Sequence, residues 1–285
     1  MRAELKELWR FRELLLSLVE REIKIRYKNS FLGFLWSLLN PLITAVVMST
    51  VFRYFLEQTV PSYGLYVLAA YLPFLFFQSA VLDSAQSVLI ALPMVRKVYF
   101  PREVLPLAQI LANFVHLLLA MVIFVVISCS VWILYPGEFP IKATVIFVPL
   151  FLVINLMLAT GCGLLVSALN TFYEDVKYMV SALLYIMFFV TPVMYFSEKV
   201  TYELSKRPNG QLLNFLYHLN PMATLCTAYR KAWLAPTPIH MKDGSEISLT
   251  MNWPMIGVAA MTSFIILVFG YSVFNRLKWK FVERP

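Results

Sequence analysis

The chain has 285 residues, of which 60% are hydrophobic and 14% charged, and its formal net charge is +8. An ordinary soluble domain carries about 25% charged residues, so this composition excludes that class and indicates an integral membrane protein. Because the basic residues cluster at the ends of apolar segments, the positive charge relates to membrane orientation and argues against nucleic-acid binding. Cys129, Cys162 and Cys226 stand apart and form neither a disulfide nor a metal-binding pattern.

Residues 1–30 are expected to form an amphipathic helix at the membrane surface. Leucines and Trp9 recur at helical spacing on one face, and Lys and Arg fill the opposite face. Such a helix belongs in the plane of the lipid headgroups, and a soluble helix that packs on a partner is the alternative. A cleavable signal peptide is not predicted, because the apolar run 14–19 is short and ends in charged residues.

Six stretches that follow are long enough, at about 20 residues, to cross the hydrocarbon layer. The expected fold class is therefore an all-α integral membrane protein made of one transmembrane domain, 1–285. The expected spans are 31–56, 63–91, 104–135, 143–168, 178–197 and 252–275. The stretch 208–229 contains too many polar residues and helix breakers for a lipid-facing helix, so region 198–251 is expected to be external and re-entrant.

Charge predicts the orientation of these spans. The first 30 residues and the last ten are rich in Lys and Arg, so both termini are expected in the cytoplasm, which requires an even number of spans. Six spans also place Arg96, Lys97, Arg102 and Lys177 on the cytoplasmic side.

The chain lacks the residues of several chemistries. It has no phosphate-binding G-x-x-x-x-G-K-[ST] loop, and its histidines are scattered rather than grouped for a metal. Asp83 and His116 are the only ionisable residues clearly inside apolar segments. Each is either a functional residue or a side chain bonded within the bundle, and a single carboxylate is not a proton pathway.

The loop 92–106 is short, cytoplasmic and bounded by prolines. Its aromatic and basic side chains are typical of a protein contact, and an ordinary basic loop at the headgroups is the alternative. The residues concerned are Arg96, Lys97, Tyr99, Phe100, Pro101 and Arg102.

Aromatic residues are dense toward the outer halves of the expected spans. An interfacial aromatic belt explains such a pattern, and a sugar-lined path does so equally, since aromatic faces suit the C–H surfaces of pyranose rings. The candidates for a path are Phe52, Tyr54, Tyr63, Tyr66, Tyr71, Phe188 and Tyr195.

Several motifs resemble those of ABC-2 type polysaccharide exporter permeases, which include the O-antigen and teichoic acid exporters. The matching segments occur in family order over nearly the whole chain. They are 21–28 followed by 32–36 and 39–41, then 95–101, 168–176, 188–195 and 219–222.

The resemblance implies a homodimer of six-span subunits, each docked on a separate P-loop ATPase that carries ATP and Mg²⁺, with no cofactor in this chain. The N-terminal helix would be an interfacial elbow, 93–102 the coupling element, and 198–251 a set of gate helices. Glu174 and Asp175 would join the coupling surface, although many relatives have a basic residue at position 174. By the same resemblance, the tract 199–251 is longer than in the shorter members of the family.

The expected function is the transport subunit, not an enzyme, of an exporter that moves a lipid-linked polysaccharide across the bacterial cytoplasmic membrane. Teichoic acid or a capsular polymer is the alternative cargo. An ion-coupled transporter would need paired intramembrane carboxylates, and a glycosyltransferase would need clustered acidic residues. Arg26 and Lys28, where the surface helix meets the first span, are expected to receive the diphosphate headgroup of the substrate. Attraction to anionic lipid is the alternative role for this basic pair.

Overall fold

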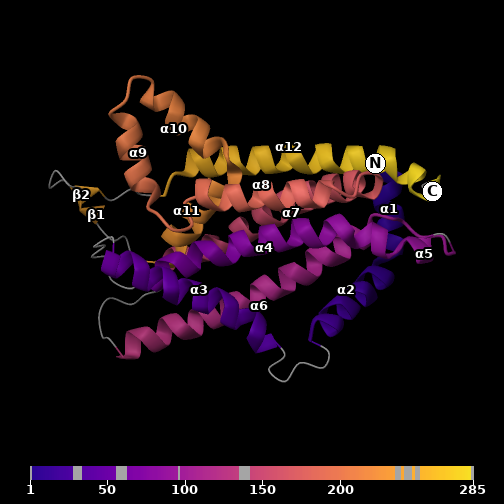
Figure 1. The fold of residues 1–285 in the computed structure, drawn as a ribbon, viewed down its shortest axis with the longest axis horizontal. Coiled ribbons are helices and arrows are strands. Elements are labelled where there is room, and N and C mark those ends of the chain that lie inside the picture. Colours follow the sequence, from indigo (N-terminus) through magenta and orange to yellow (C-terminus); the bar gives the residue numbers. More distant parts are fainter. Residues whose placement is uncertain are drawn as a thin grey trace.

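In the computed structural model, the regular elements of the described residues are helices and one short pair of strands (Figure 1). It describes residues 2–27, 34–55, 63–95, 97–134, 142–234, 239–240, 246–247 and 251–283. Lys28 and Arg96 therefore lie outside the described residues, as do the side chains of Phe52 and Tyr54.

The N-terminal region forms two helices, α1 (Arg2–Arg10) and α2 (Arg12–Tyr27), which are separated by a turn at Phe11. Leu18 and Val19 of α2 are buried, and α2 packs along α6 (Val104–Leu134). The apolar side of α2 therefore rests on the bundle.

Four helical stretches among the described residues are long and apolar enough to cross a membrane. They are Tyr63–Ile90, which is α4; Val104–Ile133 in α6; Ala143–Phe172, which joins η1 (Ala143–Phe147) to α7 (Val148–Phe172); and Trp253–Phe281, which begins with α12 (Trp253–Leu277). Two shorter apolar stretches are Leu39–Met48 in α3 (Phe34–Phe55) and Val176–Val190, which is α8. Both α3 and α8 run roughly along the long axis of the bundle (Figure 1).

Helix α8 ends at Val190, earlier than the uncharged stretch does, because of Pro192. A proline restricts the residue before it to extended backbone and cannot donate to a helical hydrogen bond. Thr191 accordingly has φ −79° and ψ 138°. The non-helical segment 191–196 then leads into α9 (Ser197–Ser205).

The region between α8 and α12 gathers at one end of the molecule. Helices α9 and α10 (Gly210–Leu219) project there as a hairpin, beside the short strands β1 (Ile239–His240) and β2 (Glu246–Ile247) (Figure 1). In contrast, α11 (Pro221–Trp233) is almost fully buried against α4 and α12. Asn220 starts α11, since its side chain accepts a hydrogen bond from the Met222 amide at 3.0 Å. We call the end of the molecule that carries α9, α10 and the two strands the distal end.

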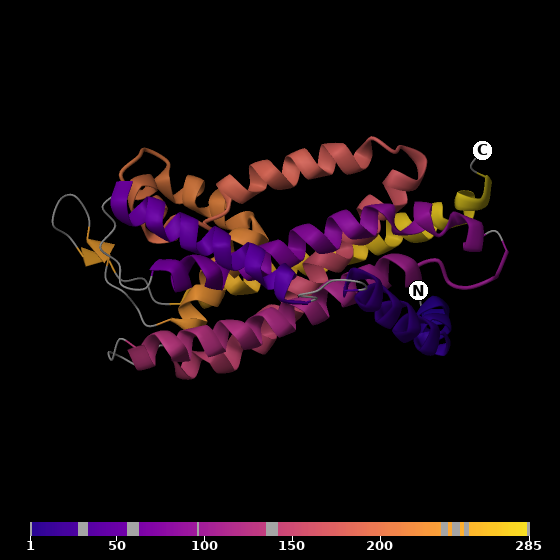
Figure 2. The ribbon, with the colours of Figure 1, turned by 60° about the horizontal axis from the view of Figure 1, so that its bottom comes forward.

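The opposite end, called the terminal end, carries both chain termini (Figure 2). It also contains α5 (Leu92–Val95), the segment 97–103, the turn 173–175 and η2 (Lys278–Glu283). A cluster of buried apolar side chains joins these parts to α2, and its members include Leu18, Val88, Phe100, Val104, Leu164, Phe274 and Phe281.

Helices α7 and α12 cross at very short distance. A Cβ atom on Gly161 would lie 2.6 Å from the carbonyl carbon of Ile266, so only glycine fits there. The two helices therefore pack backbone against backbone, in the manner of small-residue contacts between membrane helices.

Candidate functional site

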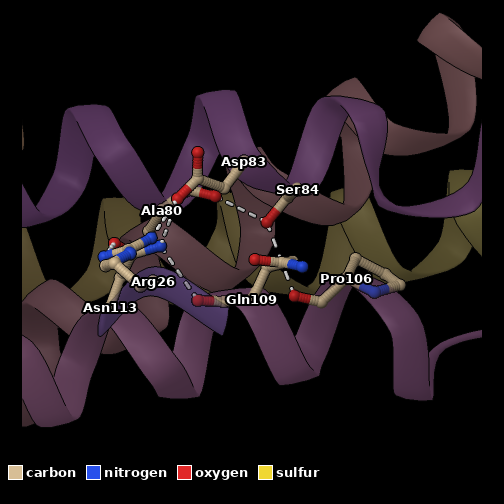
Figure 3. Close-up of polar contacts among 7 residues, drawn as sticks. All are labelled: Arg26, Ala80, Asp83, Ser84, Pro106, Gln109 and Asn113. Carbon is tan, nitrogen blue, oxygen red and sulfur yellow. Dashed lines mark hydrogen bonds and ion pairs between the residues drawn. The ribbon is translucent and has the colours of Figure 1, made fainter. Parts of the chain in front are cut away.

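Three polar side chains from three helices form a closed ring beside the C-terminal end of α2 (Figure 3). Arg26 donates from Nη2 to Asp83 Oδ2 at 2.8 Å and from Nη1 to Asn113 Oδ1 at 2.9 Å. Asn113 Nδ2 donates to the same Asp83 oxygen at 2.8 Å and to the Gln109 carbonyl at 3.0 Å. The ring links α2, α4 and α6 by charge-assisted bonds, which are stronger than bonds between neutral groups.

Helix geometry explains why these residues meet about two turns inward from the terminal end of the bundle. Asp83 lies about two turns before the end of α4, or ~10 Å along its axis at ~1.5 Å per residue. Asn113 lies a similar distance after the start of α6, the antiparallel neighbour of α4. Arg26 in the last turn of α2 reaches both. Ser84 adds a further link between α4 and α6, because it lies 3.5 Å from the Pro106 carbonyl (Figure 3).

A cavity of about 350 Å³ opens next to the ring. Its polar lining comes from Arg26, Asn40, Asn113, His116 and Ser79, and its apolar lining comes from α3, α4 and α6. The Arg26 side chain remains 35% exposed, and a guanidinium has five N–H donors, of which the two bonds above use two. Asp83 pairs with Arg26 but does not line the cavity, so the N–H groups of Arg26 that these bonds leave unused can bind an anionic head beside the apolar wall.

The residues expected to couple to an ATPase lie together at the terminal end. Tyr99 is exposed, and its hydroxyl donates to Glu7 Oε1 of α1 at 3.0 Å, which raises the pKa of the phenol. Phe100 turns inward and is buried in the cluster with Phe274 and Phe281. Adjacent residues of the same loop therefore have different roles, one at the surface and one in the core.

The other described coupling candidates lie at the same end of the bundle. Lys97 is exposed and Pro101 is half-buried. The Arg102 guanidinium lies over the Trp279 ring at 6.0 Å, and burial lowers its pKa. Glu174 and Asp175 are both exposed in the turn between α7 and α8, at the same end of the bundle.

The aromatic candidates lie toward the distal end, where several of them contact one another. Tyr66 stacks on Tyr63 with ring centroids 6.0 Å apart, and Phe196 lies 4.5 Å from Tyr66. Tyr71 on α4 contacts Phe188 on α8 at 5.9 Å. Tyr63 and Tyr195 donate to the backbone carbonyls of Met194 and Val190, respectively. A role in a sugar path stays a prediction for all of them.

The structure also identifies polar residues that the sequence analysis did not single out. Arg230 on α11 is buried and donates to the carbonyls of Tyr66, Val193 and Tyr195, so it fastens the non-helical segment 191–196 to α4. A charged residue within an otherwise weakly polar helix was the available signal. At the terminal end, Lys278 and Glu103 form a buried ion pair at 2.6 Å, which no sequence spacing predicts.

Among the described residues, no group of three or more His, Cys, Asp or Glu side chains is placed to hold a metal ion.

Comparisons with known proteins agree on one family. The ABC-2 type transporter family matches residues 13–234. The O-antigen export system permease protein RfbA of Myxococcus xanthus is 30% identical over 278 residues, covering 98% of this chain and 97% of that protein. An RfbA of Klebsiella pneumoniae is 27% identical over 271 residues, covering 95% and 94%. The polysialic acid transport protein KpsM of Escherichia coli is 24% identical over 178 residues, covering 61% of this chain and 67% of that protein.

Proposed function

Since this chain belongs to the ABC-2 type transporter family, we propose that it is the membrane subunit of an ATP-driven exporter of a lipid-linked polysaccharide such as an O-antigen. The ring of Arg26, Asp83 and Asn113 beside its cavity carries the proposal. A polymer carried on a lipid diphosphate presents two anionic phosphates above an apolar chain. Arg26 supplies the cation, and the apolar wall from α3, α4 and α6 accommodates the start of the lipid.

In this proposal the subunit crosses the membrane six times, by α3, α4, α6, α7, α8 and α12. The terminal end faces the cytoplasm, which is supported by the basic residues gathered there in α1, α2, the segment 97–103 and η2. Helices α9, α10 and α11 then form the external gate region. The names of the RfbA relatives favour an O-antigen, and the KpsM relative makes a capsular polymer the second candidate.

Two protein partners belong to the proposal. A P-loop ATPase, present in two copies, docks on the terminal end, where Lys97, Tyr99 and the turn 173–175 are exposed. A second copy of this chain covers α8, which lies on the outside of the bundle and contacts α4 and α7 along one side (Figure 2). Leu184 is the only buried residue of α8, while Met179, Leu183, Ile186 and Val190 are exposed. An apolar helix face of this kind suits either lipid or a symmetric partner.

The test is a double substitution, Arg26→Ala with Lys28→Ala, in the chain assembled with its ATPase. Surface polymer in cells and the stimulation of ATP hydrolysis by lipid-linked glycan are both expected to fall at least about ten-fold. Arg21→Ala is the matched control, because Arg21 lies on the same helix, is exposed and pairs with its neighbour Glu22. Stimulation that survives the double substitution would leave these residues only a lipid-anchoring role.

A further inference from the structure

A second cavity, of about 320 Å³, lies at the distal end between the α9–α10 hairpin, α11 and the start of α12. It is separate from the cavity at Arg26, with which it shares no lining residue. Its size falls within the ~300–1,000 Å³ of small-molecule sites. Its lining is rich in hydroxyl and amide groups, in contrast to the mainly apolar lipid-facing helices.

Hydrogen bonds within the protein define what this lining still offers to a ligand. Thr224 donates to the His218 carbonyl at 3.1 Å and Thr227 donates to the Ala223 carbonyl at 3.0 Å, so both oxygens retain lone pairs. His218 Nδ1 lies 2.9 Å from the Asn214 carbonyl. Because a carbonyl only accepts, Nδ1 carries the proton, and Nε2 remains for a ligand as an acceptor in the neutral ring or as a donor in the charged one.

Donors face the same cavity. Asn214 uses its side-chain oxygen to accept from Thr201 at 3.2 Å, and Asn252 uses its own to accept from the Met255 amide at 3.3 Å. Each carboxamide therefore keeps an NH₂ group as a donor. Trp253, which is 44% exposed, adds an aromatic surface, and Phe147 packs edge-on against its ring at 4.7 Å.

The charge of the cavity argues against an anionic ligand. Lys231 is the cation of the lining, and Glu198 lies 3.4 Å from it, so the pair is neutral overall. Lys231 is the only Lys or Arg among the described lining residues and its side chain is 18% exposed, so a phosphate would have to compete with Glu198, which does not itself line the cavity, for this one ammonium. A neutral ligand whose hydroxyls both donate and accept satisfies this lining better, and Trp253 suits the apolar C–H face of a sugar ring.

We infer that this distal cavity is a saccharide-binding site, which holds a short neutral segment of the exported polymer as it leaves the membrane. The inference rests on the proposed function, which supplies the polysaccharide. It adds a second contact with this polymer on the external side of the membrane, far from Arg26. Binding at the exit would bias the chain against sliding back between strokes of the ATPase.

The binding test uses the chain with its ATPase in phosphatidylcholine nanodiscs, which contain no sugar headgroups. The probe is a set of two- to four-sugar fragments released from the surface polymer of the source strain, measured by saturation-transfer NMR and titration. Trp253→Ala and the isosteric Asn214→Asp, which removes the donor but keeps the acceptor, are each expected to weaken binding at least about five-fold. Trp9→Ala is the matched control, because Trp9 is an exposed tryptophan at the terminal end. The basal ATPase rate shows that the variants are folded.

Three outcomes overturn the inference: wild-type protein that binds no fragment, variants that bind as wild type does, or fragments displaced by inorganic phosphate. Surface polymer in cells is measured in parallel to separate this inference from the proposed function. If wild-type chain restores surface polymer to a deletion strain and Arg26→Ala with Lys28→Ala does not, the proposed function stands whatever the distal variants do. If wild-type chain restores none, the proposed function fails.

Discussion

Replacement of Asp83 by Asn separates the structural part of the Arg26 ring from its proposed binding part. The substitution keeps the shape of the side chain and an oxygen for the Asn113 bond, but removes the charge that faces Arg26 at 2.8 Å. A hydrogen bond to a charged group contributes about 1.5–3 kcal/mol, whereas an exposed ion pair contributes about 0.2–1 kcal/mol. Both side chains are about one-third exposed, so a loss of about 1–2 kcal/mol is expected.

The measurement is a double-mutant cycle on thermal unfolding of the purified chain, with Asp83→Asn, Arg26→Ala and both together. A destabilisation of about 1–2 kcal/mol corresponds to a Tm lower by about 2–8 °C for a chain of this size class. The double variant is expected to be less destabilised than the sum of the two, because the two charges interact. Additive effects, or no loss of stability in Asp83→Asn, would show that the pair contributes nothing and refute the reasoning.

Asp83→Asn is expected to lower stability but not to impair function. Asp83→Asn releases the Arg26 guanidinium from its carboxylate, so the stimulation of ATP hydrolysis by lipid-linked glycan should persist at or above the wild-type level. Arg26→Ala should abolish it. If Asp83→Asn abolishes stimulation as Arg26→Ala does, the ring is a structural tie between α2, α4 and α6 and not a receiver of the headgroup.

Two further predictions concern packing and coupling. Gly161→Ala should prevent α7 and α12 from packing and lower thermal stability strongly, because its Cβ would lie 2.6 Å from the backbone of α12. Gly257→Ala is the control: its Cβ meets nothing within 4 Å, so the melting temperature should stay the same or rise slightly with the better helix former. Tyr99→Ala should reduce co-purification of the ATPase at an unchanged melting temperature, because Tyr99 is exposed. Phe100→Ala should instead cost about 3–5 kcal/mol of stability, because Phe100 is buried. Equal effects of the two substitutions on stability would contradict the assignment of Tyr99 to the surface and Phe100 to the core.

The sequence predicts the class of the molecule well because apolar length is a local property. Four of the expected spans correspond to helices that are long and apolar enough to cross a membrane among the described residues, and the family motifs place the loops in order. The C-terminal end of α8 was harder to predict, because the uncharged stretch continues past Val190 and only Pro192 indicates where the helix ends. Similarly, one amphipathic pattern covers both α1 and α2, and nothing in its period reveals the turn at Phe11.

The hydrogen-bond partners at the site could not be predicted from the sequence, because they lie far apart along the chain. Asp83 was recognised as an intramembrane charge, but its partners Arg26 and Asn113 are 57 and 30 residues away. Their meeting depends on how α2 packs against α6, which no local pattern encodes. The same holds for Arg230, whose partners on α4 precede it by 164 residues.

Together these contacts join the two ends of the subunit through α12. Glu103, next to the exposed loop at the terminal end, is paired with Lys278 just past the end of α12. At Gly161 and Gly270 the glycine contact leaves no side chain between the backbones of α7 and α12, so the two helices are closely packed there. At the distal end α12 packs against α11, from which Arg230 holds the segment 191–196. We propose that a displacement of the 97–103 loop by the partner ATPase would reach the gate region along these packed helices, with α12 as the connecting element.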